Sequence, residues 1–274
     1  MGPDLELALE LADTADALTL TRAGSPDLRV EVKTDLTPVT EVDRAAEAAL
    51  RAVLARARPG HAVMGEELGS SGAGPERWII DPIDGTKNYL RGVPVWATLI
   101  ALERRGAMVL GVVSAPALGR RWWAEAGGGA WVGGPGLASR SLAVSTTARL
   151  EEAFLSYDTL TEFDGYGLGP AILDLERRCW RTRGLGDFWS HVLVAEGAVD
   201  VAVEPEASLW DLAALQVIVT EAGGRFSDLA GEARADGGSA VSTNGLLHDA
   251  VLAALPSAPP PARRAPGGGA AGGR

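Results

Sequence analysis

The chain of 274 residues is 46% hydrophobic and 22% charged, an ordinary globular composition with enough length for one large domain or two closely packed ones. Its formal charge is −11 at pH 7, and residues 256–274 contribute three arginines and no acid, so the remainder is more acidic still. This charge argues against binding nucleic acid or an anionic membrane by electrostatics, although a phosphate can still bind through metal ions.

The first half of the chain predicts two helices followed by strands. Apolar residues recur with helical spacing over 4–22 and again over 41–57, where Arg58, Pro59 and Gly60 end the pattern. The period then changes to that of strands separated by short turns. The predicted strands are Trp78–Ile83, Val95–Glu103, Met108–Ala115, Arg121–Ala126 and Ala130–Val132. This order predicts two helices packed on an antiparallel sheet, an α+β layer.

After Leu142, strands and helices alternate, which is typical of an α/β layer. The predicted strands are Phe154–Tyr157, Trp180–Arg183, Val199–Val203 and Ala240–Thr243. The predicted helices are Ala171–Cys179, Phe188–Glu196, Leu209–Ala222 and Leu246–Leu255. We therefore expect an α+β subdomain over 1–141, an α/β subdomain over 142–255, and a disordered Pro/Ala/Gly-rich tail over 256–274.

Carboxylates follow the apolar strand at 78–83. The stretch 78–90 reads WIIDPIDGTKNYL, so that Asp81 and Asp84 lie in a predicted tight turn with Gly85 and Thr86 directly behind them. A glycine lets a phosphate approach the backbone, and free N–H groups at a helix start can receive it. This arrangement predicts a metal-and-phosphate turn.

Four more acids lie elsewhere in the chain. Glu66 and Glu67 precede the same strand, Asp211 begins a predicted helix, and Asp43 lies in the first turn of the second helix. Oxygen ligands without neighbouring histidine or cysteine suit Mg²⁺ rather than zinc. Two such ions bridging a phosphate can activate a water and stabilise the leaving alkoxide.

Each of these acids also has an ordinary structural interpretation. Asp-Pro and Asp-Gly are common turn formers, and Glu66-Glu67 alone is typical of a solvated charge pair. Asp43 and Asp211 alone are favourable first-turn residues of helices. His61, His191 and His248 are scattered along the chain, and we interpret them as structural or surface residues.

The joint pattern carries a family resemblance. "GEE" at 65–67, "WIIDPIDGT" at 78–86 and "LWDLAA" at 209–214, with "VTEVD" at 39–43, resemble the inositol monophosphatase superfamily of Mg²⁺-dependent phosphatases. The resemblance covers about residues 1–255 and implies a layered α-β-α-β-α sandwich. Further stretches, including "RTRGLGDFWSHVLVAEGAVD" at 181–200, resemble its histidinol-phosphatase branch. That branch implies hydrolysis of L-histidinol phosphate to L-histidinol and phosphate in histidine biosynthesis, by a homodimer.

The resemblance also implies residue roles. Two or three Mg²⁺ ions would be held by Glu66, Asp81, Asp84, Asp211 and the carbonyl of Ile83, with Glu67 behind them or at a third ion. The catalytic residues would be Glu66 and Thr86, with Asp43 supporting Thr86 as it positions the attacking water. The amides of Gly85 and Thr86 would bind the phosphate, and Asp211 would also contact the substrate. Glu204 would contact the alcohol portion of the substrate.

One segment departs from the inositol phosphatase pattern. Arg183 to Asp187 stands where those enzymes carry small residues, and an acid there suits a substrate with an ammonium group. The alternative for Asp187 is that it caps the helix expected to begin at Phe188. The alternative for Arg183 is that it pairs with an acid near the site and acts only by orienting that acid. Two other functions stay open: another sugar, inositol or nucleotide phosphatase of the superfamily, and a non-catalytic Mg²⁺-binding protein.

The location of the protein follows from three sequence features. Cys179 is the only cysteine, so no intrachain disulfide forms. The N-terminal stretch lacks the basic and apolar regions of a signal peptide. The most apolar run, Val95–Leu102, is too short for a membrane span. We therefore expect a cytoplasmic enzyme that acts on a small phosphate ester.

Overall fold

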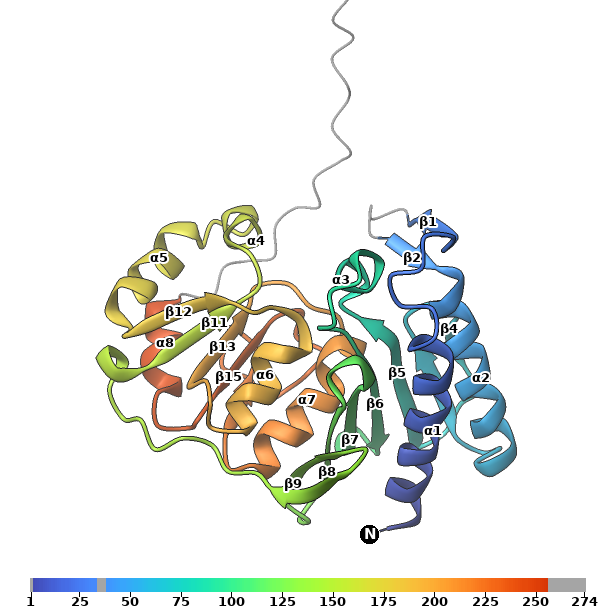
Figure 1. The fold of residues 1–274 in the computed structure, drawn as a ribbon. Helices are drawn as coiled ribbons and strands as arrows, with labels where there is room; N and C mark the ends of the chain where they lie inside the picture. The colour runs from blue at the N-terminus through green and yellow to red at the C-terminus, as the bar shows by residue number, and fades with distance from the viewer. Residues whose placement is uncertain (1, 34–37, 256–274) are drawn as a thin grey trace, which may run out of the picture.

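The computed structural model describes residues 2–33 and 38–255, which form alternating layers of helices and sheets (Figure 1). From one side to the other they are a helix pair, an eight-stranded sheet, a second helix pair, a five-stranded sheet and an outer helix layer. This arrangement confirms the α-β-α-β-α sandwich expected from the sequence. The predicted tail at 256–274 lies outside the described residues.

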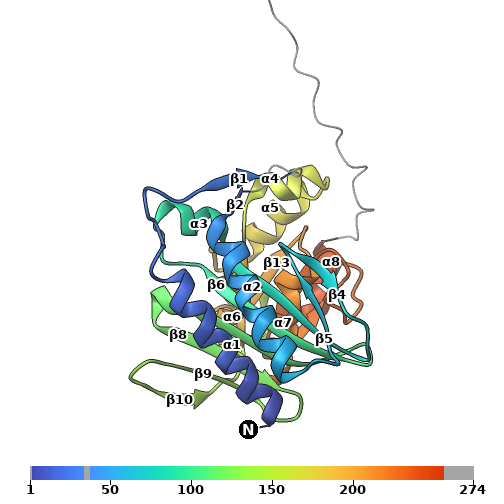
Figure 2. The ribbon, with the colours of Figure 1, turned by 90° about the vertical axis from the view of Figure 1, so that its right-hand side faces the viewer.

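The first layer consists of α1 (Pro3–Thr19) and α2 (Glu41–Ala57), which lie across the large sheet (Figure 2). Their apolar faces are buried against the sheet, with Leu11 and Leu50 packed near Trp78. The predicted bounds of α2 are confirmed, whereas α1 ends before the predicted residue 22.

The large sheet has the strand order β10-β9-β8-β7-β6-β5-β3-β4. Its strands are β3 (Ala62–Gly65), β4 (Gly69–Ser71), β5 (Glu76–Asp84), β6 (Ala97–Arg104), β7 (Ala107–Ala115), β8 (Arg120–Glu125), β9 (Ala130–Gly134) and β10 (Leu137–Ser141). The predicted strands, β5 to β9, are antiparallel to one another as expected, whereas the unpredicted β3 runs parallel to β5. The short strand β4 also went unpredicted and pairs with β3 in antiparallel fashion.

The middle layer contains α6 (Asp187–Ala195) and α7 (Leu209–Glu221). In α7, the four consecutive residues from Leu212 to Leu215 are buried, and the helix contacts strands of both sheets. A helix that is apolar all round is buried on all sides. The division of the chain near residue 141 stays a prediction.

The small sheet is mixed, with the order β12-β11-β13-β15-β14. Its strands are β11 (Phe154–Tyr157), β12 (Arg181–Gly184), β13 (Val201–Glu204), β14 (Arg225–Ser227) and β15 (Ala240–Thr243). The outer helices are α4 (Leu160–Gly165), α5 (Gly169–Arg178) and α8 (His248–Ala254). The remaining elements are β1 (Val30–Val32), β2 (Pro38–Thr40) and α3 (Thr86–Arg91).

The termini of several elements meet near the top of the molecule in Figure 1. The end of β5, the short helix α3, the starts of α6 and α7 and the end of β13 all border one cavity. Among the described residues, no helix has both the length and the apolar character needed to cross a membrane.

Candidate active site

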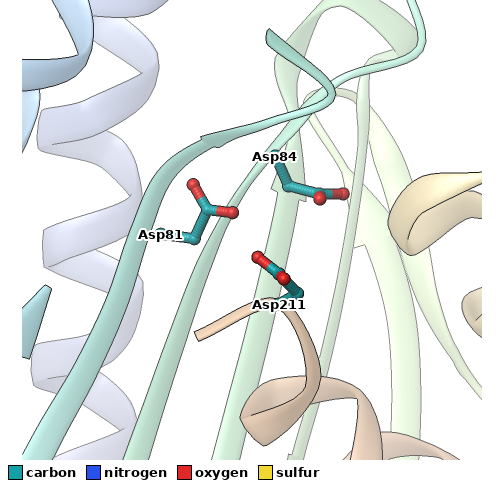
Figure 3. A group of neighbouring side chains, drawn as sticks. All are labelled: Asp81, Asp84 and Asp211. Atoms are coloured by element: carbon teal, nitrogen blue, oxygen red, sulfur yellow. The ribbon is translucent and has the colours of Figure 1, made fainter. Parts of the chain in front are cut away.

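Three aspartates from two elements face one another at this cavity (Figure 3). Asp81 and Asp84 come from the end of β5, and Asp211 comes from the first turn of α7. One carboxylate oxygen from each lies within 4.8 Å of the other two. Three converging, largely buried carboxylates form a group that can hold a metal ion.

The end of β5 brings its two aspartates to the same side. Residues three apart on a regular strand point to opposite faces of the sheet. Here Asp81 pairs with Leu99 and Asp84 with Ala97, so three steps on β5 match two on β6. Pro82 fits this irregularity because it has no N–H for the ladder. The predicted tight turn is therefore a bulge inside β5, which continues through Asp84.

Asp211 and Asp43 have equivalent positions in their helices. Asp211 is the third residue of α7 and accepts a hydrogen bond from the Ser208 N–H at 2.7 Å. Asp43 is the third residue of α2 and accepts from the Thr40 N–H at 2.8 Å. Both aspartates therefore complete capping boxes. The structural interpretation of each holds, and Asp211 additionally borders the cavity.

Asp43 is completely buried and does not line the cavity. Burial raises the pKa of this carboxyl to about 6, against the opposing effect of its hydrogen bonds to Thr40. Its Oδ1 atom is buried without a hydrogen-bond partner. The Thr86 hydroxyl instead donates to the Ile83 carbonyl at 2.9 Å. In the part of the chain that the structure describes, no hydrogen bond joins Asp43 to Thr86.

The electrostatics of the three aspartates fit a cation site. Burial is the largest cause that raises the pKa of Asp81, followed by the charges of Glu66, Asp84 and Asp211. Burial also raises the pKa of Asp84, and it raises the pKa of Asp211 to about 8. Like charges in a buried site resist ionisation unless a cation compensates them. The all-oxygen donor set fits a hard cation such as Mg²⁺.

A lysine that the sequence analysis missed joins the two glutamates at 66 and 67. Lys33 Nζ lies 2.7 Å from Glu66 Oε1 and 2.5 Å from Glu67 Oε1. Burial alone lowers the pKa of Lys33, but its hydrogen bonds to both glutamates outweigh burial and raise that pKa. Glu66 lines the cavity, whereas Glu67 lies behind it with a side chain only 4% exposed.

A second missed residue, Glu47, holds the loop that carries these glutamates. Its fully buried carboxylate accepts from the N–H groups of Glu67 at 2.8 Å and Leu68 at 3.2 Å. Arg51 donates to the same carboxylate at 2.7 Å. The only sequence signal for Glu47 was its position on α2, four residues after Asp43. Glu47 therefore fixes the backbone beside Glu66.

The cavity has a volume of about 460 Å³ and brings together most of the predicted site residues. Those that line it are Glu66, Asp81, Ile83, Asp84, Gly85, Thr86, Asp187, Glu204 and Asp211. Arg183 is not among them: its exposed side chain donates to the Thr182 carbonyl at 2.8 Å. Polar lining residues that sequence reasoning missed are Lys87, Asn88, Asp158, Thr159, Glu162 and Glu206.

The start of α6 settles one alternative. The residue at its N-cap is Gly186, and Asp187 is already the first residue of the helix. The side chain of Asp187 therefore does not make the capping hydrogen bond that the alternative requires. Asp84 instead accepts from the Phe188 N–H at 2.7 Å, so a residue of the aspartate group caps α6. The interpretation of Asp187 as the helix cap was wrong.

Gly186 has φ +69°, and a Cβ there would lie 2.4 Å from Asp158 Oδ1, so the close approach requires glycine.

Asp187 belongs to a second group of acids in the lining of the cavity. Burial and then Asp158 and Glu204 raise the pKa of Asp187 to about 7. Burial and then Asp158 raise the pKa of Glu162 to about 8. Among the described lining residues Lys87 is the only base. This group therefore favours a positively charged ligand.

Comparisons with known proteins match the chain to one family of phosphatases. The model of the inositol monophosphatase family matches residues 3–259. A histidinol-phosphatase of Mycobacterium tuberculosis is 56% identical over 92% of this chain and 97% of its own, and one of Streptomyces coelicolor is 53% identical over 91% and 95%. The solved structure of a Thermotoga maritima IMPase superposes with a TM-score of 0.83 at 36% identity, covering 92% of this chain and 96% of that one.

Proposed function

Because the chain belongs to the inositol monophosphatase family, we propose that it hydrolyses L-histidinol phosphate to L-histidinol and phosphate in histidine biosynthesis. The observation that carries this proposal is the acidic side of the cavity, where Asp158, Glu162, Asp187 and Glu204 face the space beside the aspartate group. A substrate with an ammonium group gains charge-assisted contacts there that a neutral polyol does not. The two histidinol-phosphatases named above support the same substrate.

The metal chemistry proposed for the site uses two or three Mg²⁺ ions. When bound, such ions lower the pKa of a water and stabilise the leaving alkoxide. Their ligands would be Glu66, Asp81, Asp84, Asp211 and the Ile83 carbonyl, with Glu67 behind them or at a third ion. The uncompensated charge of the buried aspartates supports this assignment. Lys33, paired with Glu66 and Glu67, would have to move or share these glutamates with a cation.

The chain's own residues would orient the water and the phosphate. Thr86 holds its hydroxyl against the Ile83 carbonyl, which leaves the oxygen lone pairs to accept a hydrogen bond from the attacking water. Asp43 would support Thr86 as it positions this water, because Asp43 Oδ1 is buried without a partner and can accept the Thr86 hydroxyl when that hydroxyl turns away from the Ile83 carbonyl. The N–H groups of Gly85 and Thr86 would bind the phosphate, since both residues line the cavity beside Asp84 and Asp211.

The alcohol portion of the substrate would extend toward Asp187 and Glu204. Asp187 has φ +46°, a backbone conformation that an aspartate tolerates better than most residues, and it accepts from Asn88 Nδ2 at 3.3 Å. Arg183 has the weakest support among the proposed substrate residues, because its side chain is exposed and lies outside the lining. We further propose a homodimer, as the family resemblance implies, and a cytoplasmic location, in keeping with a single cysteine, Cys179.

The test is phosphate release from a panel of phosphomonoesters with and without Mg²⁺. The panel contains L-histidinol phosphate, inositol 1-phosphate, fructose 1,6-bisphosphate, phosphoadenosine phosphate and phenyl phosphate. We expect Mg²⁺-dependent turnover, with kcat/KM at least about tenfold higher for histidinol phosphate than for inositol 1-phosphate. A preference for inositol 1-phosphate would identify another phosphatase of the family, and no turnover of any ester would identify a Mg²⁺-binding protein.

A further inference from the structure

His191 is a buried imidazole one helical turn below Asp187. It lies on α6, four residues after Asp187, and is completely buried. Residues four apart lie on the same face of a helix. The face of α6 that presents Asp187 to the cavity therefore also carries His191 beneath the cavity wall. The contacts of its two ring nitrogens indicate what this histidine does in the structure.

One ring nitrogen is held by the small sheet. Nδ1 lies 2.7 Å from the Oγ atom of Ser242, a fully buried residue of β15. The other nitrogen, Nε2, is buried, makes no well-aligned hydrogen bond, and lies 3.3 Å from Glu204 Oε1. A carboxylate oxygen accepts hydrogen bonds, so this neighbour favours the tautomer with the proton on Nε2, in which the Ser242 hydroxyl donates to Nδ1. The chain of contacts thus runs from β15 through His191 to Glu204.

Glu204 connects this buried pair to the cavity. It is the last residue of β13, is only 7% exposed, and lines the cavity beside Asp187. Among the described residues its carboxylate makes no hydrogen bond, and the 3.3 Å approach of His191 Nε2 is its contact with a possible donor. A long, flexible side chain with one possible donor beside it depends on that donor for its orientation.

We propose that His191 is a positioning residue, whose Nε2–H directs the Glu204 carboxylate at the alcohol portion of the bound phosphate ester. This inference deepens the proposed function and rests on its placement of the alcohol portion at Glu204. The imidazole touches neither the phosphate nor the group of three aspartates. Its loss therefore weakens recognition of the substrate's alcohol portion and leaves phosphoryl transfer itself unchanged.

His248 provides a matched control. It is also completely buried, and its two ring nitrogens contact Ser227 at 2.9 Å and Thr243 at 3.1 Å. It lies on α8 and does not line the cavity. A change at His248 therefore reports the cost of losing a buried, hydrogen-bonded histidine without touching the site.

The experiment compares His191→Leu, His191→Gln, Ser242→Ala and His248→Leu. The readout is kcat/KM for the best substrate of the ester panel divided by kcat/KM for phenyl phosphate, which offers Glu204 no ammonium or hydroxyl group. We expect His191→Leu to lower this ratio roughly tenfold, mainly through KM, with phenyl phosphate changed less than about twofold. His191→Gln keeps an N–H near the Nε2 position and should retain most of the ratio. Ser242→Ala should lower it slightly, and His248→Leu should leave it unchanged.

An unchanged ratio in His191→Leu, or equal losses on both substrates, would overturn the inference. If His191→Leu does not fold, His191→Met takes its place, and a ratio in that variant equal to the wild-type ratio overturns the inference. The ratio is taken with whichever ester the wild type hydrolyses best. A wild type that does not prefer histidinol phosphate therefore contradicts the proposed substrate while the inference on His191 is still tested.

Discussion

The two groups of carboxylates that line the cavity are held in different ways. Asp81, Asp84 and Asp211 each accept a backbone N–H, from Ile83 at 2.9 Å, Phe188 at 2.7 Å and Ser208 at 2.7 Å. The polar contacts that Asp187 and Glu204 make among the described residues are with side chains, those of Asn88 and His191, each at 3.3 Å.

This difference separates chemistry from specificity. Main-chain donors stay in place when side chains change, so the aspartate group keeps its geometry as long as β5, α6 and α7 keep their positions. Side-chain neighbours can be exchanged singly, so the acids on the substrate side can be altered without moving the aspartates. Under the proposed function, the metal-binding aspartates would be held rigidly and the acids that meet the substrate would be adjustable.

The largest expected effect comes from the main-chain-held group. Asp84→Asn or Asp211→Asn should abolish turnover, with a loss well beyond tenfold, while the fold stays intact because an amide oxygen still accepts the backbone N–H. The metal-free variants should be at least as thermally stable as the metal-free wild type, because like-charge repulsion is relieved. Steady-state rates and melting curves check this. Retention of more than about a tenth of the rate, ~1.4 kcal/mol of barrier, would show that the metal ligands are other residues.

A smaller and more selective effect is expected on the opposite side. Asp187→Ala should lower kcat/KM for histidinol phosphate roughly tenfold, because a charge-assisted contact to the ammonium group is worth about 1.5–3 kcal/mol. Hydrolysis of phenyl phosphate should change little, since the aspartate group and the Gly85–Thr86 segment are untouched. The measurement is the ratio of the two kcat/KM values, and equal losses on both esters would mean that Asp187 serves the fold or the aspartates instead.

An intermediate case is the loop of Glu66 and Glu67, which Glu47 holds through backbone N–H groups. Glu47→Gln should raise the Mg²⁺ concentration for half-maximal activity by roughly three- to tenfold, because the loop loses an ionised acceptor. The rate at saturating Mg²⁺ should stay close to that of the wild type. The control is Glu103→Gln. Glu103 lies away from the cavity, and its carboxylate is paired with Arg77 at 2.5 Å. An equal Mg²⁺ requirement in both variants would contradict the role of Glu47.

The smallest effect is a dependence of stability on pH. The pKa of Asp187 is raised to about 7 and that of Asp211 to about 8, chiefly by burial, so the folded protein binds protons that the unfolded chain has lost. Their stabilising contribution is complete below their unfolded pKa of ~4 and is lost as pH rises through 7–8. Metal-free protein should therefore melt lower at pH 9 than at pH 6.5, on the order of 5 °C.

Mg²⁺ should restore this loss, with a larger gain in melting temperature at pH 9 than at pH 6.5, because protons compete with the metal. The comparison starts at pH 6.5 because of His248, whose pKa is lowered to about 4 chiefly by burial. This histidine destabilises the fold only below pH 6.5, where the unfolded chain begins to bind its proton. The double variant Asp187→Asn/Asp211→Asn should show a flatter profile. A metal-free melting temperature that rises toward pH 9 would contradict the assignment of these groups.

By itself, the sequence determined the features that depend on neighbouring residues. The period of apolar residues defined α2 and β15 to the residue, and the run through Asp81 and Asp84 predicted two of the three aspartates that converge at the cavity. First-turn positions placed Asp43 and Asp211 at helix starts, as the capping boxes confirm. Short elements such as β4 and β14 went unpredicted, because three residues are too few to show a period.

Only the tertiary structure decided which distant residues share the cavity. Lys33 beside Glu66, Glu47 behind Leu68, and Asp158 and Glu162 beside Asp187 are pairs whose members carry no local signal of one another. The parallel pairing of β3 with β5 and the contact of His191 with Glu204 likewise join segments through packing. The physical reason is that pattern and turn chemistry act over a few residues, whereas the charge and hydrogen bonding of a buried group depend on all the elements packed around it.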